Sequence, residues 1–138
     1  MDNSLYMKFD AKSQNEAFAR SAVASFVIPL NPSLEEINDI KTAVSEAATN
    51  AVVHAYKDEL GTIEIFETIT GNTVEIIIQD QGVGIEDIKT AIKPFYTTKP
   101  DEERAGMGFA VMQALMDEVE VKNREGGGLI VKLTKHIN

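Results

Sequence analysis

Apolar and polar positions alternate with two different periods along this chain, and each change of period marks a predicted element. Residues 5–9 alternate as a half-buried strand does, and a helical pattern follows over residues 13–27. A second, longer helical pattern runs over residues 34–56. Pro29 and Pro32 separate the two helices, because proline cannot continue a helix.

Both predicted helices begin with a sequence typical of a capping box. Ser13 and Glu16 have the required spacing in the first helix, and Ser33 and Glu36 have it in the second. In such a box the serine and glutamate side chains bond to each other's backbone N–H groups. We therefore expect both helices to start at these residues.

Strands and helices both occur in the second half of the chain. Two stretches rich in Ile, Val and Thr, 62–68 and 73–79, are separated by Gly71 and Asn72, which predicts a hairpin. The later segments are predicted as a short helix at 85–92, a loop at 94–105, a helix at 107–116, and a hairpin of strands 118–123 and 129–137. The pattern predicts one α+β domain over residues 1–138, with one sheet and helices on one face.

Composition narrows the class of protein. The 138 residues include 22 acidic and 13 basic residues, for a net charge of −9. This acidity argues against a nucleic acid or an anionic membrane surface as the main partner. The absence of cysteine excludes disulfides, thiolate metal sites and cysteine nucleophiles. No apolar run approaches the roughly 20 residues of a membrane span, and the N-terminus lacks signal-peptide features, so we expect a cytoplasmic protein.

Glu46 and Asn50 are four residues apart in the second predicted helix, which places them on one face about 6 Å apart along the axis. The amide oxygen of Asn50 is a suitable Mg²⁺ ligand, and Glu46 can accept a proton from an attacking hydroxyl. The alternative is a polar stripe on a solvated helix face.

Asp80, Gly82 and Gly84 follow directly after a predicted strand. Glycine lets a ligand approach the backbone closely, and the Asp80 carboxylate can accept a hydrogen bond from an exocyclic amine such as adenine N6. The alternative is an ordinary strand-to-helix turn.

Gly106 and Gly108 are predicted to open the helix at 107–116, where exposed N–H groups would form an anion site. The preceding loop supplies hydroxyl donors and cations, which suits a lid over phosphates. These loop residues are Thr97, Thr98, Lys99 and Arg104. The alternative is a flexible entry to a core helix. Neither a standard phosphate loop nor the eukaryotic-type protein kinase motifs occur.

The order of these motifs resembles the ATPase and kinase superfamily that includes gyrase, Hsp90, histidine kinases and MutL. Glu46 and Asn50 match its N box, and two glycine boxes follow at 80–84 and 106–108. Within it, the run 45–56 and the segments 95–100 and 103–109 are similar to the small anti-sigma serine kinases of Gram-positive bacteria, in particular those of sporulation. The similarity extends over nearly the whole chain.

This resemblance implies a two-layer α/β sandwich, a histidine-kinase-like ATPase fold with a mixed, largely antiparallel sheet. It implies a protein that binds ATP with Mg²⁺, forms a homodimer, sequesters a sigma factor and phosphorylates a serine of an anti-anti-sigma protein. Glu46 would be the general base, Asn50 the metal ligand and Asp80 the adenine reader. The remaining nucleotide contacts would come from Gly82, Gly84, Thr98, Lys99, Arg104, Gly106, Met107 and Gly108.

Arg104 can grip the γ-phosphate with two parallel hydrogen bonds, although it could also be a solvated lid residue. The chain departs from the family at Leu129 and Ile130, where relatives carry threonine after the glycine turn, which leaves one secondary adenine contact open. His54 is expected to pack against the sheet, and Arg20 either meets a protein partner or only adds surface charge.

Three alternative functions stay open at this point. The chain could be a non-catalytic, ATP-binding module that sequesters a sigma factor, or the anti-sigma kinase of a stress-response sigma factor. It could also be a detached catalytic domain of a histidine kinase. Glu46 is the residue that separates a kinase from a pure binding module, because a module needs no base there.

Overall fold

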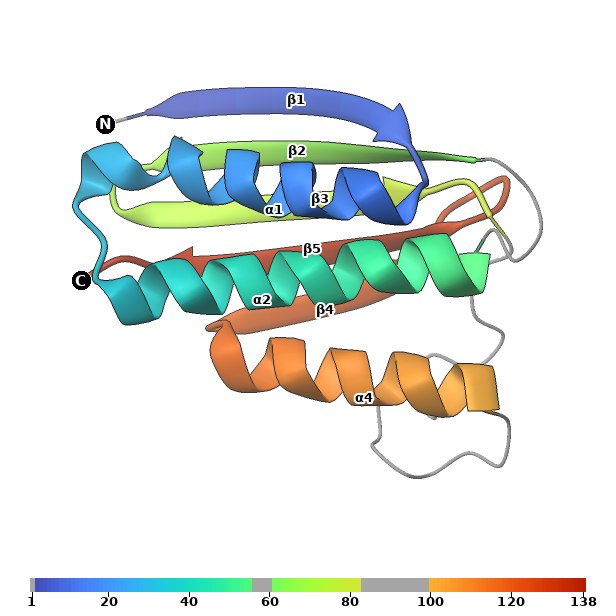
Figure 1. Ribbon diagram of the computed structural model, residues 1–138. Coiled ribbons are helices and arrows are strands. Elements are labelled where there is room, and N and C mark those ends of the chain that lie inside the picture. Colours follow the sequence, from blue (N-terminus) through green and yellow to red (C-terminus); the bar gives the residue numbers. More distant parts are fainter. Residues whose placement is uncertain (1, 56–60, 83–99) are drawn as a thin grey trace.

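The computed structural model describes residues 2–55, 61–82 and 100–138, and within these ranges the side chains of all residues except 54, 55 and 100–106. One sheet forms a layer, and the helices lie together on one of its faces (Figure 1). The elements in chain order are β1 (Asn3–Asp10), α1 (Ser13–Phe26), a 3₁₀ turn η1 (Ile28–Leu30), α2 (Leu34–Asn50), a π-helical turn η2 (Ala51–Ala55), β2 (Thr62–Thr70), β3 (Thr73–Asp80), α4 (Pro100–Leu115), β4 (Glu118–Asn123) and β5 (Leu129–His136).

The strands lie side by side in the order β1-β2-β3-β5-β4, and each of these described neighbour pairs is antiparallel. The predicted α+β fold, with a largely antiparallel sheet and helices on one face, is confirmed. The order inserts β5 between β3 and β4. The start of β5 therefore lies beside the end of β3, where Gln79 pairs with Ile130.

Alternation along each strand sends apolar side chains to the helix layer. In β2, the side chains of Ile63, Ile65 and Ile69 are fully buried on that face. Phe66 points to the other face, where its ring lies 4.8 Å from that of Tyr6 in β1. Because side chains alternate faces at every residue, this pattern fixes the register of each strand.

α2 is the central helix of the helix layer, with α1 packed on one side and α4 on the other (Figure 1). Ile40 and Val44 of α2 are fully buried, as are Phe109 and Met112 of α4. These side chains anchor both helices to the core of the protein. None of the helices in the described part of the chain is long and apolar enough to cross a bilayer.

One of the two predicted capping boxes is present. Ser33 is the N-cap of α2: Glu36 N–H donates to Ser33 Oγ at 3.1 Å, and Ser33 N–H donates to Glu36 Oε1 at 2.8 Å. The box predicted at Ser13 is wrong, because Ser13 is already helical and the N-cap is Lys12. The carboxylate of Glu16 accepts instead from the hydroxyl of Ser45 in α2.

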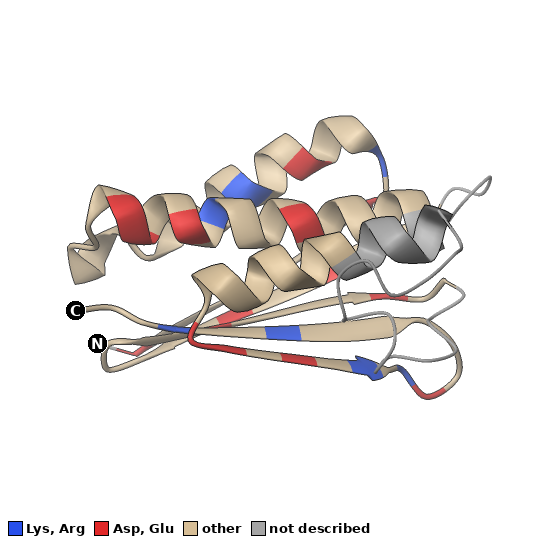
Figure 2. Ribbon diagram, turned by 90° about the horizontal axis from the view of Figure 1, so that it is seen from below, with Lys and Arg blue, Asp and Glu red and all other residues tan. Residues whose placement is uncertain are grey.

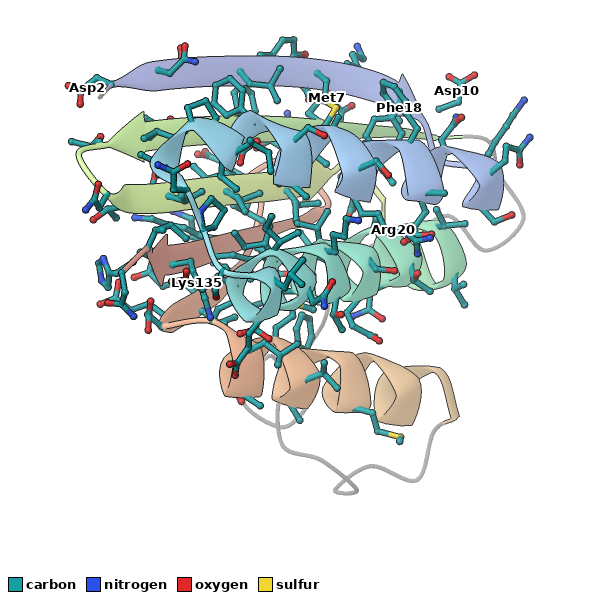
Figure 3. The ribbon with its side chains drawn as sticks, turned by 60° about the vertical axis from the view of Figure 1, so that its left-hand side comes forward. Asp2, Met7, Asp10, Phe18, Arg20 and Lys135 are labelled. Carbon is teal, nitrogen blue, oxygen red and sulfur yellow. The ribbon has the colours of Figure 1, made fainter. Side chains whose placement is uncertain are left out.

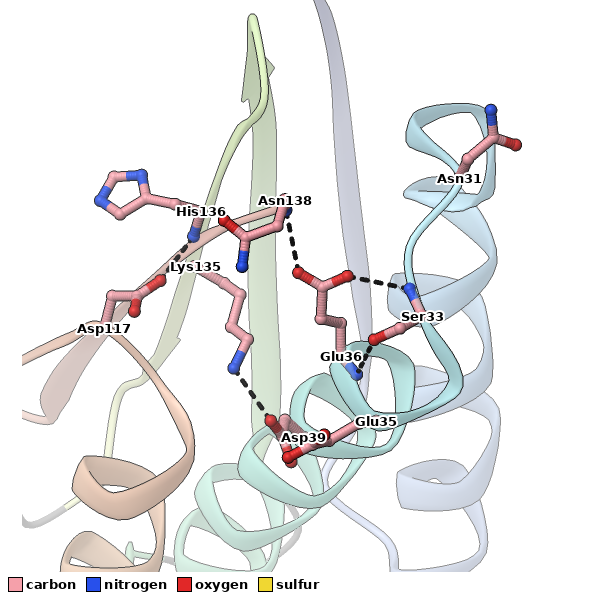
Figure 4. Close-up of a pocket in the computed structure, with 9 residues that line it drawn as sticks. All are labelled: Asn31, Ser33, Glu35, Glu36, Asp39, Asp117, Lys135, His136 and Asn138. Atoms are coloured by element: carbon pink, nitrogen blue, oxygen red, sulfur yellow. Dashed lines mark hydrogen bonds and ion pairs between the residues drawn. The ribbon is translucent and has the colours of Figure 1, made fainter.

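A polar cleft of about 460 Å³ lies at the N-terminal end of α2 (Figure 4). Glu36 accepts there from the backbone N–H groups of Ser33 and Asn138, and these bonds hold the pKa of Glu36 below its usual value. Lys135 Nζ lies 2.9 Å from Asp39 Oδ2. Most charged groups in this cleft are thus engaged in joining the last strand to the helices.

The helix predicted at 107–116 begins earlier than the sequence pattern indicates. Residues 100–105 were expected in a loop, but α4 starts at Pro100, so Gly106 and Gly108 lie inside the helix. Proline at the first helical position is favourable, because its missing N–H would lack a partner there anyway. The predicted short helix at 85–92 and the rest of the predicted loop lie outside the described residues.

Candidate active site

Glu46 and Asn50 lie one turn apart near the end of α2, on the side that packs against α4. Gly108 of α4 lies opposite both side chains. A methyl group placed on its Cα would be 2.9 Å from Asn50 Nδ2 and 3.1 Å from Glu46 Oε2. The prediction that the two residues share one helix face is confirmed. That face contacts another helix and is not a solvated polar stripe.

The amide of Asn50 is buried, with an exposed fraction of 7%. Its Nδ2 finds no hydrogen-bond partner among the described residues. A buried N–H donor without a partner costs about 1–3 kcal/mol, so such a donor is usually paired with an acceptor on a ligand, an anion or water. The Nδ2 group of Asn50 is therefore a buried donor that a bound ligand could pair with.

Asn50 is also the last α-helical residue of α2, directly before the π-helical turn η2. π-turns are rare and occur often at functional sites, where they redirect side chains. η2 contacts both β3 and α4, and its first residue, Ala51, is 4% exposed. The turn thus packs the end of α2 against β3, the strand that carries Asp80.

Asp80 ends β3 with a buried carboxylate, which is 4% exposed. Its Oδ1 accepts from Gly82 N–H at 2.9 Å and from Leu129 N–H at 3.3 Å. Two backbone donors from different segments hold this carboxylate in one orientation. The C-terminal end of β3 lies at the same end of the molecule as the C-terminal end of α2 (Figure 1). A fixed acceptor of this kind can select a base that offers an amino group.

The turn between β4 and β5 also contributes to the candidate site, although the sequence pattern predicted only a hairpin there. Gly126, Gly127 and Gly128 all have positive φ angles. Gly128 lies so close to β3 that a Cβ atom would be 2.0 Å from the carbonyl oxygen of Asp80. The run of three glycines indicates an unusual turn in the sequence. Only the strand order shows that this turn lies against the end of β3.

The same turn includes Leu129, where the chain departs from the family. The side chain of Leu129 is buried in the core, and its backbone N–H is the group that reaches Asp80. Every residue except proline supplies this donor. The departure from threonine therefore leaves the contact to Asp80 intact.

A groove of about 330 Å³ reaches Glu46 from between α1 and α2. Two cations line it, Arg20 of α1 and Lys41 of α2. Figure 2 shows basic segments, in blue, among acidic ones, in red, on the helix layer. Arg20 lies beside α2 in Figure 3, and its Nη1 is 3.4 Å from Glu16 Oε1. The other lining residues are Asn38, Thr42 and Ser45. Glu46 thus borders the contact with α4 and an open groove.

The remaining predicted site residues are placed only in part. Gly106 lies within α4, and the Met107 side chain is 46% exposed. Arg104 lies in the same helix, but its side chain is outside the described part of the chain. Gly84, Thr98 and Lys99 are also outside the described residues, as is the side chain of His54.

The layered α+β architecture, with an antiparallel sheet and helices on one face, is that of an ATPase domain of the histidine-kinase type. The family model of the histidine kinase-like ATPase domain matches residues 9–135. The chain superposes on the catalytic domain of histidine kinase ThkA with a TM-score of 0.62 at 15% identity, covering 96% of both chains. It superposes on the RsbU and RsbW domains of Rv1364c from Mycobacterium tuberculosis with a TM-score of 0.71 at 22% identity, covering 98% of this chain and 32% of that one.

Relatives with high sequence identity identify the family within this class of ATPase domains. The anti-sigma F factor of Thermoanaerobacter sp. is 53% identical over 135 residues, which are 98% of this chain and 94% of that protein. The anti-sigma F factor of Clostridium beijerinckii is 49% identical over 138 residues, covering 99% and 96%. This chain belongs to the anti-sigma F factor family of histidine kinase-like ATPase domains.

Proposed function

We propose that this protein is an Mg-ATP-dependent serine kinase that also sequesters a sporulation sigma factor. Its substrate would be a serine hydroxyl of an anti-anti-sigma protein. The observation that carries the proposal is the convergence of Glu46 and Asn50 at Gly108. A carboxylate and a buried amide at one helix face are the groups that phosphoryl transfer needs from a protein, one as base and one as metal ligand.

Asp80 is the proposed adenine reader. Its Oδ1 is oriented by two backbone N–H groups, so the side chain would lose little conformational entropy when a nucleotide binds. The triphosphate would extend from there toward the α2 and α4 helices, past η2. The proposed phosphate contacts are the residues expected from the family, namely Gly82, Gly84, Thr98, Lys99, Arg104, Gly106, Met107 and Gly108.

The donor set fits Mg²⁺. The described residues contain no group of three or more His, Cys, Asp or Glu side chains that could hold a metal by themselves. Mg²⁺ is commonly bound by one or two protein oxygens together with substrate phosphates and waters. The buried amide of Asn50 can supply one such oxygen. When bound there, Mg²⁺ would offset negative charge on the phosphates.

Glu46 would act on the acceptor. The serine oxygen attacks the γ-phosphorus, the bond to the bridging oxygen of the β-phosphate breaks, ADP leaves, and the serine proton passes to the Glu46 carboxylate. The groove between α1 and α2 offers a path to Glu46 for a segment of a protein substrate. Arg20 and Lys41 in that groove would suit a segment with acidic residues near the serine.

The partner assignments rest on the relatives. Proteins named anti-sigma F factor match this chain over nearly their whole length. From their name we infer a sigma factor as the sequestered partner. The homodimeric state and the role in sporulation are proposed from the family resemblance of the sequence. The bound nucleotide could select which partner surface is favoured, because a ligand shifts the population toward the conformation that it binds more tightly.

The test is phosphoryl transfer from radiolabelled ATP to an anti-anti-sigma protein, with Glu46→Gln as the variant. We expect E46Q to lose transfer while nucleotide affinity stays within about threefold, because the base acts only in the transition state. Equal loss of binding and transfer in a folded E46Q protein contradicts this role. Absence of transfer by the wild type, with sigma binding retained, identifies a non-catalytic module. Transfer to histidine identifies a histidine kinase.

A further inference from the structure

Gly108 is a glycine at a helix position where helix stability gives no reason for one. It lies inside α4, where glycine destabilises a helix by about 1 kcal/mol relative to alanine. Its neighbours Phe109 and Met112 are fully buried and fix the helix against the core. Helix stability therefore favours alanine at this position, and the glycine needs another reason.

That reason is visible in the space around it. A methyl group at position 108 would lie 2.9 Å from Asn50 Nδ2, 3.1 Å from Glu46 Oε2 and 3.4 Å from Asn50 Oδ1. The first of these distances is too short for a carbon atom, so something has to move. α4 cannot withdraw without opening the core at Phe109. Asn50 is buried, so its amide cannot turn into solvent.

We propose that Gly108 is a positioning residue: the absence of its side chain sets where the Asn50 amide and the Glu46 carboxylate lie. This role is separate from any contact between the Gly108 backbone and phosphate. The inference rests on the proposed function in one respect: that function makes Asn50 a metal ligand and Glu46 a base, so their placement matters for transfer. The steric relationship itself exists without nucleotide.

The first test uses the protein without ligand. If Gly108 were needed only for phosphate, Gly108→Ala would raise the melting temperature by about 3 °C through helix propensity. Because the methyl group meets Asn50, we expect no rise, or a fall of similar size. In an Asn50→Ala background, where the amide is gone, G108A should recover the rise. A rise of about 3 °C in both backgrounds overturns the proposal.

The second test measures function in the same variants. G108A keeps its backbone N–H, so nucleotide binding in EDTA should stay within about threefold, whereas the gain in affinity on adding Mg²⁺ should disappear. The rate of transfer at saturating Mg-ATP should fall about 100-fold at unchanged KM for the protein substrate, since a displacement of 1 Å in a catalytic group costs about that much. Gln113→Ala, at an exposed position on the same helix, is the matched control and should change none of these quantities.

The outcomes separate the two hypotheses. Loss of transfer in E46Q, together with wild-type Mg²⁺ dependence and transfer in G108A, contradicts the positioning role and leaves the proposed function intact. The expected melting-temperature cycle in a protein that transfers no phosphate supports the steric role and contradicts the kinase. A G108A protein that loses nucleotide binding in EDTA assigns Gly108 to the phosphate contact and overturns the inference.

Discussion

Gly128 lies directly against the backbone of Asp80, so close that a Cβ atom would be 2.0 Å from the Asp80 carbonyl oxygen. The two residues are 48 positions apart and belong to different hairpins, which the antiparallel pairing of β3 with β5 brings together. The next residue, Leu129, donates its N–H to the Asp80 carboxylate at 3.3 Å. The orientation of the proposed adenine reader therefore depends on a turn near the C-terminus.

Replacement of Gly128 tests this relationship. Gly128→Ala should lower the free energy of unfolding by about 3 kcal/mol, from backbone strain at φ +104° and from overlap with Asp80, and nucleotide affinity should fall at least tenfold. Gly126→Ala is the matched control, because its φ of +89° imposes similar strain without the overlap. Urea denaturation and calorimetric titration with ATP measure the two effects. Equal losses in both variants would mean that the contact with Asp80 is unimportant.

Glu67 is a buried acid on the core face of β2, opposite Leu5 and Ile76 of the neighbouring strands. It is fully buried, and its two carboxylate oxygens have no partner among the described residues. Burial raises the pKa of Glu67 to about 9. Between pH 4.5 and 9 the folded state therefore keeps a proton that the unfolded chain releases, so stability falls as the pH rises through this range.

Glu67→Gln should remove this pH dependence. We expect E67Q to be more stable than the wild type by about 3 kcal/mol at pH 8, with little difference near pH 4.5. Glu120→Gln, whose parent side chain is 74% exposed on β4, should leave the pH profile unchanged. Free energies of unfolding measured by urea denaturation from pH 5 to 9 decide the matter. A wild-type profile parallel to that of E67Q would show that Glu67 has an ordinary pKa.

Lys135 joins three elements at the far end of the molecule (Figure 4). Its Nζ donates to Asp39 of α2 at 2.9 Å and to the carbonyl oxygen of Leu115, the last residue of α4, at 2.6 Å. Lys135→Met should lower the free energy of unfolding by about 2 kcal/mol, because it leaves a partly buried carboxylate and a helix-end carbonyl without a donor.

Lys132→Met is the control for this variant. Lys132 also pairs with carboxylates, but its side chain is 38% exposed, whereas that of Lys135 is 12% exposed. An exposed pair contributes about 0–1 kcal/mol, so K132M should change stability little. Chemical denaturation of both variants measures the difference. A loss in K132M as large as that in K135M would refute the role of burial.

The extent of α4 leads to a prediction about nucleotide binding. Gly106 and Gly108 lie beyond the first turn of α4, where backbone N–H groups normally bond to carbonyls four residues earlier. They can donate to phosphates only if the beginning of α4 unwinds. NMR Cα and carbonyl shifts of residues 100–107 should thus change from helical toward coil values with Mg-ATP, while those of Val111 and Gln113 stay helical. Helical shifts at saturating nucleotide would exclude these N–H groups as the phosphate cradle.

Local sequence signals predicted most of the secondary structure. Period-two alternation placed the strands within two residues of their observed ends, because half-buried strands need that pattern. The capping box at Ser33 formed as predicted, whereas the one at Ser13 did not. In the second case Glu16 bonds to Ser45 of α2, a partner that lies 29 positions away. A rule based on the spacing of neighbouring residues cannot predict a hydrogen bond to a residue so far away in the chain.

The sequence by itself determined the class of fold, the pairing of Glu46 with Asn50 on one helix face, and Asp80 at a strand end. These features follow from spacing along a single element, where helix and strand geometry are nearly invariant. Only the tertiary structure decided that Gly108 faces that pair and that Gly128 presses on Asp80. Both contacts join elements distant in the chain, and helix packing and strand order bring them together through the burial of a shared core.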